Sequence, residues 1–284
     1  MSKTATLLIH CPDRPGIVAG ISNFLYVHGA NILHADQHQD NEVGLFFMRV
    51  EFDLAKFTLD EASVRAEFGA LANDFGMQWR IAYSAQRPAI AIFVSQYLHC
   101  LVDLLYRHKL GELPCTIPLI ISNHRDAEEL AGFYGIPFHH FPMNGNDKSE
   151  VEAAQLKLLE GNGVDLVVLA RYMQILSPDF VARYPQRIIN VHHSFLPAFS
   201  GARPYHAAHE RGVKLIGATS HYVTEVLDEG PIIEQDVVRV SHRDQVEDLV
   251  QKGRDMERMV LSRAVKWHME NRILHYSSKT VIFD

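Results

Sequence analysis

The sequence predicts an α/β protein of two units, a ferredoxin-like βαββαβ sandwich over residues 1–86 and a Rossmann-like domain over residues 87–284. Two observations lead to this prediction. In the first part, strand-like runs and two segments with helical spacing follow one another in the order βαββαβ. In the second part, apolar strands alternate with helices, which is typical of a parallel sheet covered on both faces. The segment AQRP (85–88) between them has the composition of a linker.

The elements of the first unit follow from local patterns. Residues 13–29 open with the turn DRPG and then show apolar residues at helical spacing, which predicts a helix. A second helix is expected over residues 58–76, ending near Gly76. The strands are expected at residues 4–11, 30–40, 42–53 and 77–84.

The second unit contains a strand that is apolar on both faces, VDLVVLA at residues 164–170. Such a strand belongs in the middle of a parallel sheet, where ligands bind beyond the carboxyl ends of the strands. No glycine-rich nucleotide motif follows the first strand of this unit, so nucleotide binding has no support. The other strands are expected at residues 89–95, 116–123, 136–142, 187–191, 213–223 and 231–240, and helices at 126–135, 148–163 and from about Asp244.

Composition excludes several classes of protein. The 284 residues carry a formal net charge of -7, which argues against a general binder of nucleic-acid backbones. No apolar run has the length of a membrane span, and the first residues lack the pattern of a signal peptide. Cys11, Cys100 and Cys115 have neither disulfide-framework nor zinc spacing. We therefore expect a soluble cytoplasmic protein with no nucleic-acid or membrane partner.

Three features converge at predicted strand ends of the second unit. Asn190 and His192 alternate along one strand and project to the same face, whereas His193 is expected to point the other way. LARYMQIL follows the buried strand, and Asp228 lies in the loop between two late strands. An amide, an imidazole and a carboxylate suit acyl chemistry, because they can stabilise an oxyanion and transfer protons. The alternative is a structural histidine and an aspartate of an ordinary turn.

The combination of NVHHSFLPAFSG, DEGPII and LARYMQIL resembles the folate-dependent formyltransferase family over about residues 89–284. The resemblance implies that Asn190, His192 and Asp228 are the catalytic residues. CPDRPGIVAGISNFL resembles the start of an ACT domain, and an ACT domain ahead of such a domain is similar to the formyltetrahydrofolate deformylases. This implies hydrolysis of 10-formyltetrahydrofolate to formate and tetrahydrofolate, which supplies formate for purine synthesis and balances one-carbon pools. The folate is the substrate, and neither a cofactor nor a metal is expected.

The same resemblance implies a pterin pocket between two segments. Arg171 and Gln174 replace residues that are often glycine and arginine in the transferases. The alternative for Ile175 and Leu176 is that they belong to the core, and we expect His221 to be a strand residue rather than a partner of the site. The residues expected to bind substrate are Arg171, Tyr172, Met173, Gln174, Ile175, Leu176, Val223, Thr224 and Glu225.

Two departures from the transferases favour water as the acceptor. Residues 94–105 follow the first strand of the domain without a glycine, where glycinamide ribonucleotide formyltransferases have a phosphate-binding loop. We also expect no basic barrel domain of the kind that methionyl-tRNA formyltransferases carry. Two alternatives stay open: transfer to a small non-phosphorylated amine bound beside residues 199–210, and a non-catalytic amino-acid and folate sensor.

The expected mechanism gives each group one role. Asp228, with its pKa raised by burial, deprotonates the attacking water, while Asn190 and protonated His192 bind the oxyanion. His193 is expected to have no catalytic role. His206 and His209 have a spacing that occurs in metal sites, but no carboxylate partner is evident.

The ACT resemblance also implies regulation. Asp13, Arg14, Gly16, Gly29 and Asn31 lie in the matching segments and are expected to bind an amino-acid effector, glycine or methionine. Homo-oligomers are expected to form through these domains. The alternative is a domain that only pairs subunits.

Overall fold

The computed structural model describes residues 3–143, 147–197 and 204–284, which form two compact units. Unit 1 comprises residues 1–87 with residues 271–276 and 280–284, and unit 2 comprises residues 88–270 with residues 277–279. The predicted α/β class is confirmed. No helix among the described residues is long and apolar enough to span a membrane.

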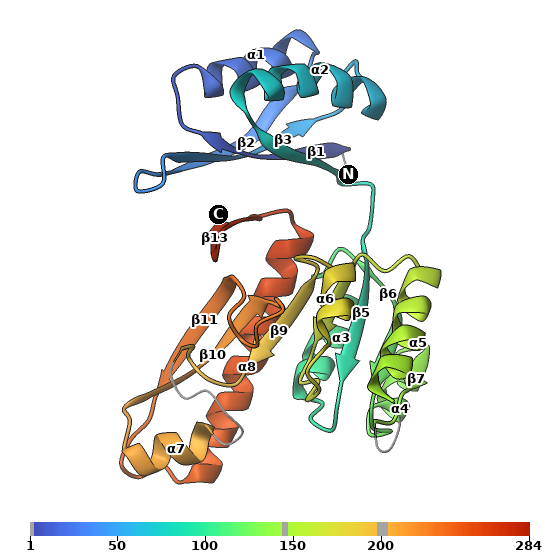
Figure 1. Ribbon diagram of the computed structural model, residues 1–284, viewed down its shortest axis with the longest axis vertical. Helices are drawn as coiled ribbons and strands as arrows, with labels where there is room; N and C mark the ends of the chain where they lie inside the picture. Colours follow the sequence, from blue (N-terminus) through green and yellow to red (C-terminus); the bar gives the residue numbers. More distant parts are fainter. Residues whose placement is uncertain (1–2, 144–146, 198–203) are drawn as a thin grey trace. The chain divides into compact units, whose positions relative to one another are not determined.

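Unit 1 has the predicted βαββαβ order (Figure 1). Its antiparallel sheet has the strand order β2-β3-β1-β4, and both helices cover one face of it. Helix α2 begins where the Asp60 carboxylate accepts a hydrogen bond from the Ser63 amide, and ends at Gly76, which is left-handed with φ 63°. The elements are β1 (Thr4–Pro12), α1 (Ile17–Val27), β2 (Asn31–Asp40), β3 (Leu45–Asp53), α2 (Glu61–Phe75) and β4 (Gln78–Tyr83).

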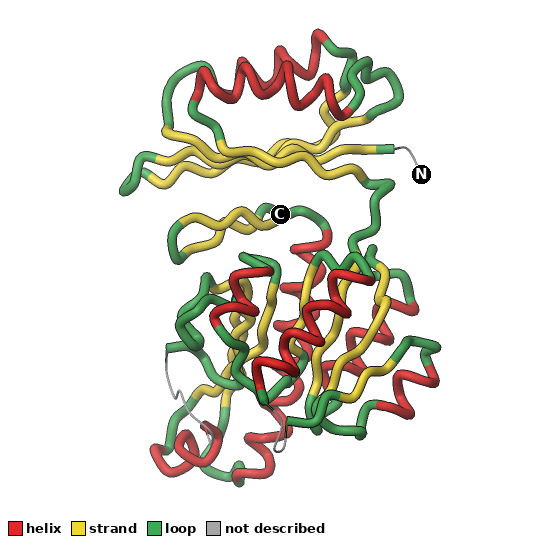
Figure 2. The backbone as a smooth tube through the Cα atoms, turned by 45° about the vertical axis from the view of Figure 1, so that its right-hand side comes forward, coloured by secondary structure: helices red, strands yellow, loops and turns green. Residues whose placement is uncertain are grey.

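The other face of this sheet is covered by the end of the chain, which the predicted division into residues 1–86 and 87–284 did not anticipate. Strands β12 (Ile273–Tyr276) and β13 (Lys279–Ile282) form a hairpin beside the sheet (Figure 2). Leu8 and Phe47 point away from the helices and pack with Leu274 and Phe283 of the hairpin segment. The hairpin therefore provides unit 1 with a second, smaller core.

Unit 2 is built on a seven-stranded sheet of order β11-β10-β9-β8-β5-β6-β7. The five neighbouring strands β9, β8, β5, β6 and β7 are parallel to one another. Strands β10 and β11 are antiparallel to their neighbours. The elements are β5 (Ala89–Val94), α3 (His99–Lys109), β6 (Thr116–Ser122), α4 (Glu128–Phe133), β7 (Phe138–His140), α5 (Lys148–Gly161), β8 (Leu166–Leu169), α6 (Pro178–Arg183), β9 (Ile188–His192), α7 (Pro204–Arg211), β10 (Leu215–Tyr222), β11 (Ile232–Arg239) and α8 (Val246–Met269).

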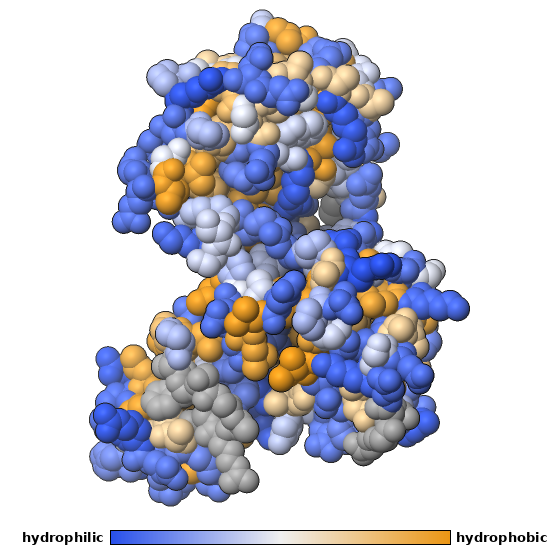
Figure 3. Space-filling model, in the orientation of Figure 1, coloured by the Kyte–Doolittle hydropathy of each residue, from blue (hydrophilic) through white to orange (hydrophobic). Residues whose placement is uncertain are grey.

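The sheet of unit 2 is buried on both faces. Phe93 of β5 packs in a core with Leu159 of α5 and Phe180 of α6, while Ile90 and Ile92 on the opposite face of β5 are also fully buried. Helix α8 runs along β9, β10 and β11 and packs against α3. With apolar residues inside, the face drawn in Figure 3 is mostly hydrophilic. Chain order reverses direction between β5 and β8, so their carboxyl ends border a crevice suited to a site.

Truncation of Phe283, which is 1% exposed, should destabilise unit 1. We expect Phe283→Ala to lower the free energy of unfolding of this unit by about 3–5 kcal/mol, because a buried ring is removed and a cavity is left. Urea unfolding followed by Trp79 fluorescence in a Trp267→Phe background measures unit 1 alone. Phe133→Ala, at a position 75% exposed on α4, is the matched control and should cost less than about 0.5 kcal/mol. Equal effects of both changes would contradict a core role for the hairpin segment.

Candidate active site

Strands β8 and β9 bring two sequence segments to one edge of the sheet. They are parallel neighbours, with Leu169 paired to Asn190, so both chains leave the sheet at the same edge. On the other side of β9, the antiparallel strand β10 places His221 directly opposite Asn190. His192 is the last residue of β9 and is 7% exposed. The candidate site therefore forms around the carboxyl end of β9.

Asp228 reaches this edge from the loop between β10 and β11. Its Oδ2 lies 3.1 Å from His192 Nδ1, and its Oδ1 lies 3.5 Å from His221 Nε2. Asp228 is left-handed, with φ 58°. Two residues later Gly230 approaches β10 so closely that a Cβ would lie 1.7 Å from the Tyr222 carbonyl oxygen, so only glycine fits. The Asp-x-Gly-Pro turn thus presses the loop against β10 and aims the carboxylate at both imidazoles.

The hydrogen bonds from His192 and His221 lower the pKa of Asp228 and outweigh the opposing effect of burial. The expectation that burial raises this pKa was therefore wrong. The carboxyl group is half-buried, and the two imidazoles stabilise its charged form. In this arrangement Asp228 is an anion that orients its neighbours rather than a strong proton acceptor.

The ring nitrogens of His192 and His221 differ in their hydrogen-bond partners. When His192 donates its Nδ1 proton to Asp228, the lone pair of Nε2 is available, and Nε2 has no hydrogen-bond partner among the described residues. His221 Nδ1 lies 2.9 Å from the Tyr222 carbonyl oxygen, which fixes the ring, and its Nε2 lies 3.3 Å from Asn190 Nδ2. A neutral His221 accepts from Asn190, and a charged one donates to Asp228. His221 is thus a partner of the site, and the expectation of a plain strand residue was wrong.

His193 does not point away from His192, as strand alternation predicted. The strand ends at His192, and the two rings stack with centroids 5.1 Å apart and an interplanar angle of 22°. Burial, followed by the charges of Arg171 and His192, lowers the pKa of His193 to about 4. At neutral pH, His193 is therefore an uncharged ring that stacks against the imidazole of His192.

A cavity of about 380 Å³ unites the predicted catalytic and substrate-binding residues. All nine predicted substrate-binding residues, 171–176 and 223–225, line it together with Asn190, His192 and Asp228. Leu176 is 9% exposed and belongs to the core as well, whereas Ile175 is 61% exposed. Further lining residues, none of which the sequence assigned to the site, are Leu169, Val191, His193, His221 and Leu227.

The loop at residues 171–176 is held by the segment that follows β5. Ser95 Oγ accepts a hydrogen bond from the Met173 amide at 3.0 Å and donates to Asn123 Oδ1 at 2.6 Å. The Ser95 amide donates to the Arg171 carbonyl oxygen at 3.3 Å. The glycine-free segment after the first strand therefore fixes the wall of the cavity, which gives it a structural role in place of phosphate binding.

The predicted regulatory residues of unit 1 separate into two groups. Asp13, Arg14 and Gly16 line a cavity of about 350 Å³ with Gln37, His38 and Gln39 of β2, and Gln39 donates to Asp13 at 2.6 Å. Gly29 and Asn31 lie beyond the other end of α1 and do not line this cavity. Gly29 is required for the chain path, because a Cβ there would lie 2.5 Å from the Lys56 carbonyl oxygen.

The lowered pKa of His193 makes stability depend on pH. Its pKa falls from 6.5 to about 4 on folding, so the unfolded chain binds a proton more readily and acid weakens unit 2. We expect stability to decline as pH falls from 6.5 to 4, by up to about 3 kcal/mol from this residue. His193→Gln should flatten that decline, and His206→Gln, at an exposed position of α7, should not. Urea unfolding followed by Trp267 fluorescence in a Trp79→Phe background is the measurement. Parallel pH curves for wild type and His193→Gln would refute the assignment.

Two family models match separate parts of the chain. A model of the formyl transferase family matches residues 89–265, and a model of the ACT domain matches residues 5–71. Both resemblances found in the sequence are thereby confirmed. Strand β11 and most of α8 lie inside the first match, whereas the hairpin of unit 1 lies outside both.

Curated relatives and solved structures match nearly the whole chain. A formyltetrahydrofolate deformylase of Synechocystis sp. is 56% identical over 99% of this chain and 98% of its own, and one of Bacillus subtilis is 54% identical over 98% and 93%. The crystal structure of a formyltetrahydrofolate deformylase from Pseudomonas syringae has a TM-score of 0.97 at 50% identity and covers 100% of this chain and 95% of its own. A glycinamide ribonucleotide transformylase from Symbiobacterium toebii, at 32% identity and a TM-score of 0.67, covers 70% of this chain and 95% of its own. With identities of this order over the full length of both units, the chain belongs to the formyltetrahydrofolate deformylase family.

Proposed function

We propose that this protein hydrolyses 10-formyltetrahydrofolate to formate and tetrahydrofolate, with water as the only acceptor. The observation that carries the proposal is the convergence of Asn190, His192 and Asp228 on one cavity with both predicted pterin-binding segments. Relatives at 42–56% identity over nearly the whole chain bear the name of this activity. The reaction needs only the folate and water, so we propose no cofactor and no metal.

The geometry suggests how the proton moves. Asp228 holds His192 by Nδ1, so Nε2 takes a proton from water as the oxygen attacks the formyl carbon. The Asn190 amide donates to the developing oxyanion, a kind of contact worth about 10²–10³ in rate. His192 then gives the proton to N10 as the carbon–nitrogen bond breaks, and formic acid loses its own proton to solvent. The general base is thus His192, with Asp228 stabilising its charged form.

An acceptor site for an amine has little support. The sequence placed such a site beside residues 199–210; residues 198–203 lie outside the described chain, but Tyr205 is described. It is 9% exposed, does not line the cavity, and donates its hydroxyl to Glu257 at 2.8 Å. A buried, bonded side chain offers nothing to a second substrate. Release of formate fits the supply of purine synthesis. The buried cysteines Cys11, Cys100 and Cys115 fit a cytoplasmic location.

Asp228→Asn should lower kcat by about 10²–10⁴-fold, because the amide cannot stabilise the imidazolium of His192. Folate binding should stay largely intact. The assay uses purified protein with 10-formyltetrahydrofolate and no amine, and follows formate and tetrahydrofolate together. Equal release of both products is expected from wild type and from Asp179→Asn, an exposed position at the start of α6. Retention of a tenth of the wild-type rate by Asp228→Asn would rule out its role, and release only on addition of an amine would make the protein a transferase.

The ACT domain is the proposed site of an amino-acid effector, glycine or methionine. Helix α1 begins at Gly16 without a side-chain cap, so its amides are available to a ligand carboxylate, and Asp13 in the same cavity suits the ammonium group. The exposed edge strand β2 suits pairing of two copies into a homo-oligomer.

Asp13→Asn should weaken effector binding at least about tenfold, since a charge-assisted hydrogen bond is worth about 1.5–3 kcal/mol. Isothermal titration with glycine and methionine measures this, and Asp36→Asn, a partly buried position of β2 that does not line the cavity, should bind as wild type does. Sedimentation of the same proteins reports pairing. If neither amino acid binds at millimolar concentration, the domain only pairs subunits.

A further inference from the structure

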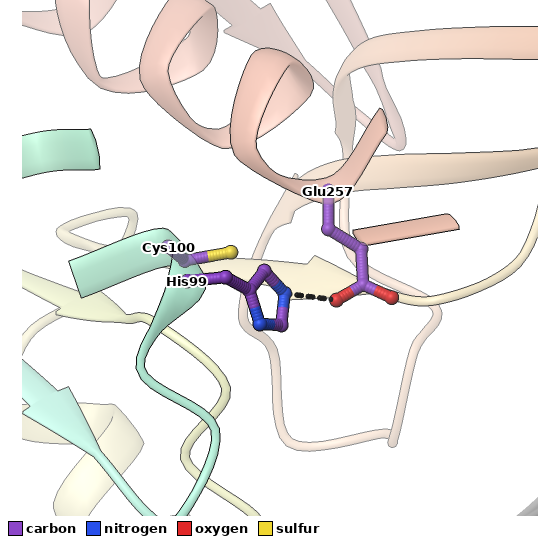
Figure 4. Close-up of side chains that lie close together, drawn as sticks. All are labelled: His99, Cys100 and Glu257. Carbon is purple, nitrogen blue, oxygen red and sulfur yellow. Dashed lines mark hydrogen bonds and ion pairs between the residues drawn. The ribbon is translucent and has the colours of Figure 1, made fainter. Parts of the chain in front are cut away.

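A second cluster of charged and polar side chains lies behind the wall of the candidate site. Glu257, in the middle of α8, is 1% exposed and points toward His99 at the start of α3 (Figure 4). Its Oε2 lies 2.7 Å from His99 Nε2 and 3.4 Å from Arg171 Nε, and its Oε1 accepts the Tyr205 hydroxyl at 2.8 Å. We call these four residues the Glu257 cluster. Burial of a carboxylate costs free energy unless partners such as these compensate its charge.

Helix α8 has a glycine at the position where it contacts this cluster. Gly253 lies one turn before Glu257, and a Cβ there would be 2.0 Å from the Tyr205 hydroxyl oxygen. Glycine inside a helix costs about 1 kcal/mol relative to alanine, so its presence is explained by the space that the Tyr205 ring needs.

His99, Cys100 and Glu257 are also near enough to one another to resemble a metal site, with candidate atoms within 4.8 Å. The chemistry of the donors does not fit a metal. Burial and the Glu257 charge raise the pKa of Cys100 well above its usual range, so the thiol stays protonated. The Glu257 carboxylate is already engaged by a short contact with His99, a hydrogen bond from Tyr205 and an ion pair with Arg171.

Arg171 connects the cluster with the candidate site. It lines the cavity, its side chain is 10% exposed, and its backbone is left-handed with φ 64°. Among the described residues, Glu257 provides the only carboxylate within ion-pair distance of Arg171. The guanidinium also packs 5.5 Å from the Tyr97 ring. The charge of an arginine on the cavity wall is therefore balanced by a single buried acid.

We propose that Glu257 determines acceptor specificity: by neutralising Arg171, it keeps the cavity wall from holding a phosphate and so excludes phosphorylated acceptors beside the formyl carbon. Arginine guanidinium is the side chain best suited to phosphate, and an unpaired one in a partly dry cavity binds anions strongly. Water, being neutral and small, needs no such cation. This inference rests on the proposed hydrolysis and explains how the acceptor is limited to water.

Glu257→Gln tests the proposal, because it removes the charge and keeps the shape of the side chain. Inorganic phosphate is the probe, at constant ionic strength set with chloride. We expect phosphate to inhibit hydrolysis by this variant at a concentration at least tenfold lower than for wild type, by raising KM with little effect on kcat. Tyr205→Phe removes a hydrogen bond from the same carboxylate without a change in charge, and should leave phosphate inhibition as in wild type.

The double variant Arg171→Gln/Glu257→Gln identifies the source of the effect. It should lose the phosphate sensitivity of Glu257→Gln, since no unpaired cation remains. Thermal unfolding gives a second readout that needs no turnover: phosphate should raise the Tm of Glu257→Gln and not that of wild type or the double variant. Equal sensitivity of the single and double variants, or none in either, would overturn the proposal. Because binding is measured directly, this result stands apart from whether wild type releases formate.

Discussion

The carboxylate of Asp228 between two imidazoles is the interaction on which the candidate site depends. It joins three segments that are distant in the sequence: the end of β9 through His192, the end of β10 through His221, and its own loop. The loop is placed by the close approach of Gly230 to Tyr222, and the strands by the register that pairs Asn190 with His221. Removal of the anion leaves two buried imidazoles without their shared partner, so the charge that orients His192 is lost.

Another carboxylate, that of the buried Glu257, positions a residue of the cavity wall, as Asp228 positions His192. Glu257 forms an ion pair with the Arg171 side chain, while Ser95 forms hydrogen bonds with the backbone of the same loop. The two clusters meet at His193, whose ring stacks on His192 and whose pKa is lowered in part by Arg171. A change of charge at Arg171 therefore alters the environment of the His192 imidazole, even though the two side chains belong to different networks.

Local patterns in the sequence sufficed for the strands of both sheets and for the nine residues expected to bind substrate, because periodicity and strand ends are short-range properties. The helices at residues 99–109 and 178–183 were not predicted. The role of His221 depends on an antiparallel pairing with Asn190, a long-range register that one strand cannot reveal. The covering hairpin had a signal, since Leu8 and Phe47 are apolar on the face of the sheet away from the helices, but the partner lies more than 200 residues away. The pKa of Asp228 was predicted with the wrong sign because burial was weighed without the two imidazoles.

Hydrolysis and formyl transfer share the attack on a formyl carbon, so what separates them is the space and the charge beside that carbon. In a transferase the wall must attract the second substrate, whereas in a hydrolase it must only leave room for water. Here the polar groups that could bind a second substrate already have partners within the protein. Arg171 pairs with Glu257, Tyr205 donates a hydrogen bond to the same carboxylate, and Ser95 after β5 accepts one from the neighbouring loop. In the proposed account, hydrolysis is favoured because these side chains satisfy one another and do not attract a second substrate.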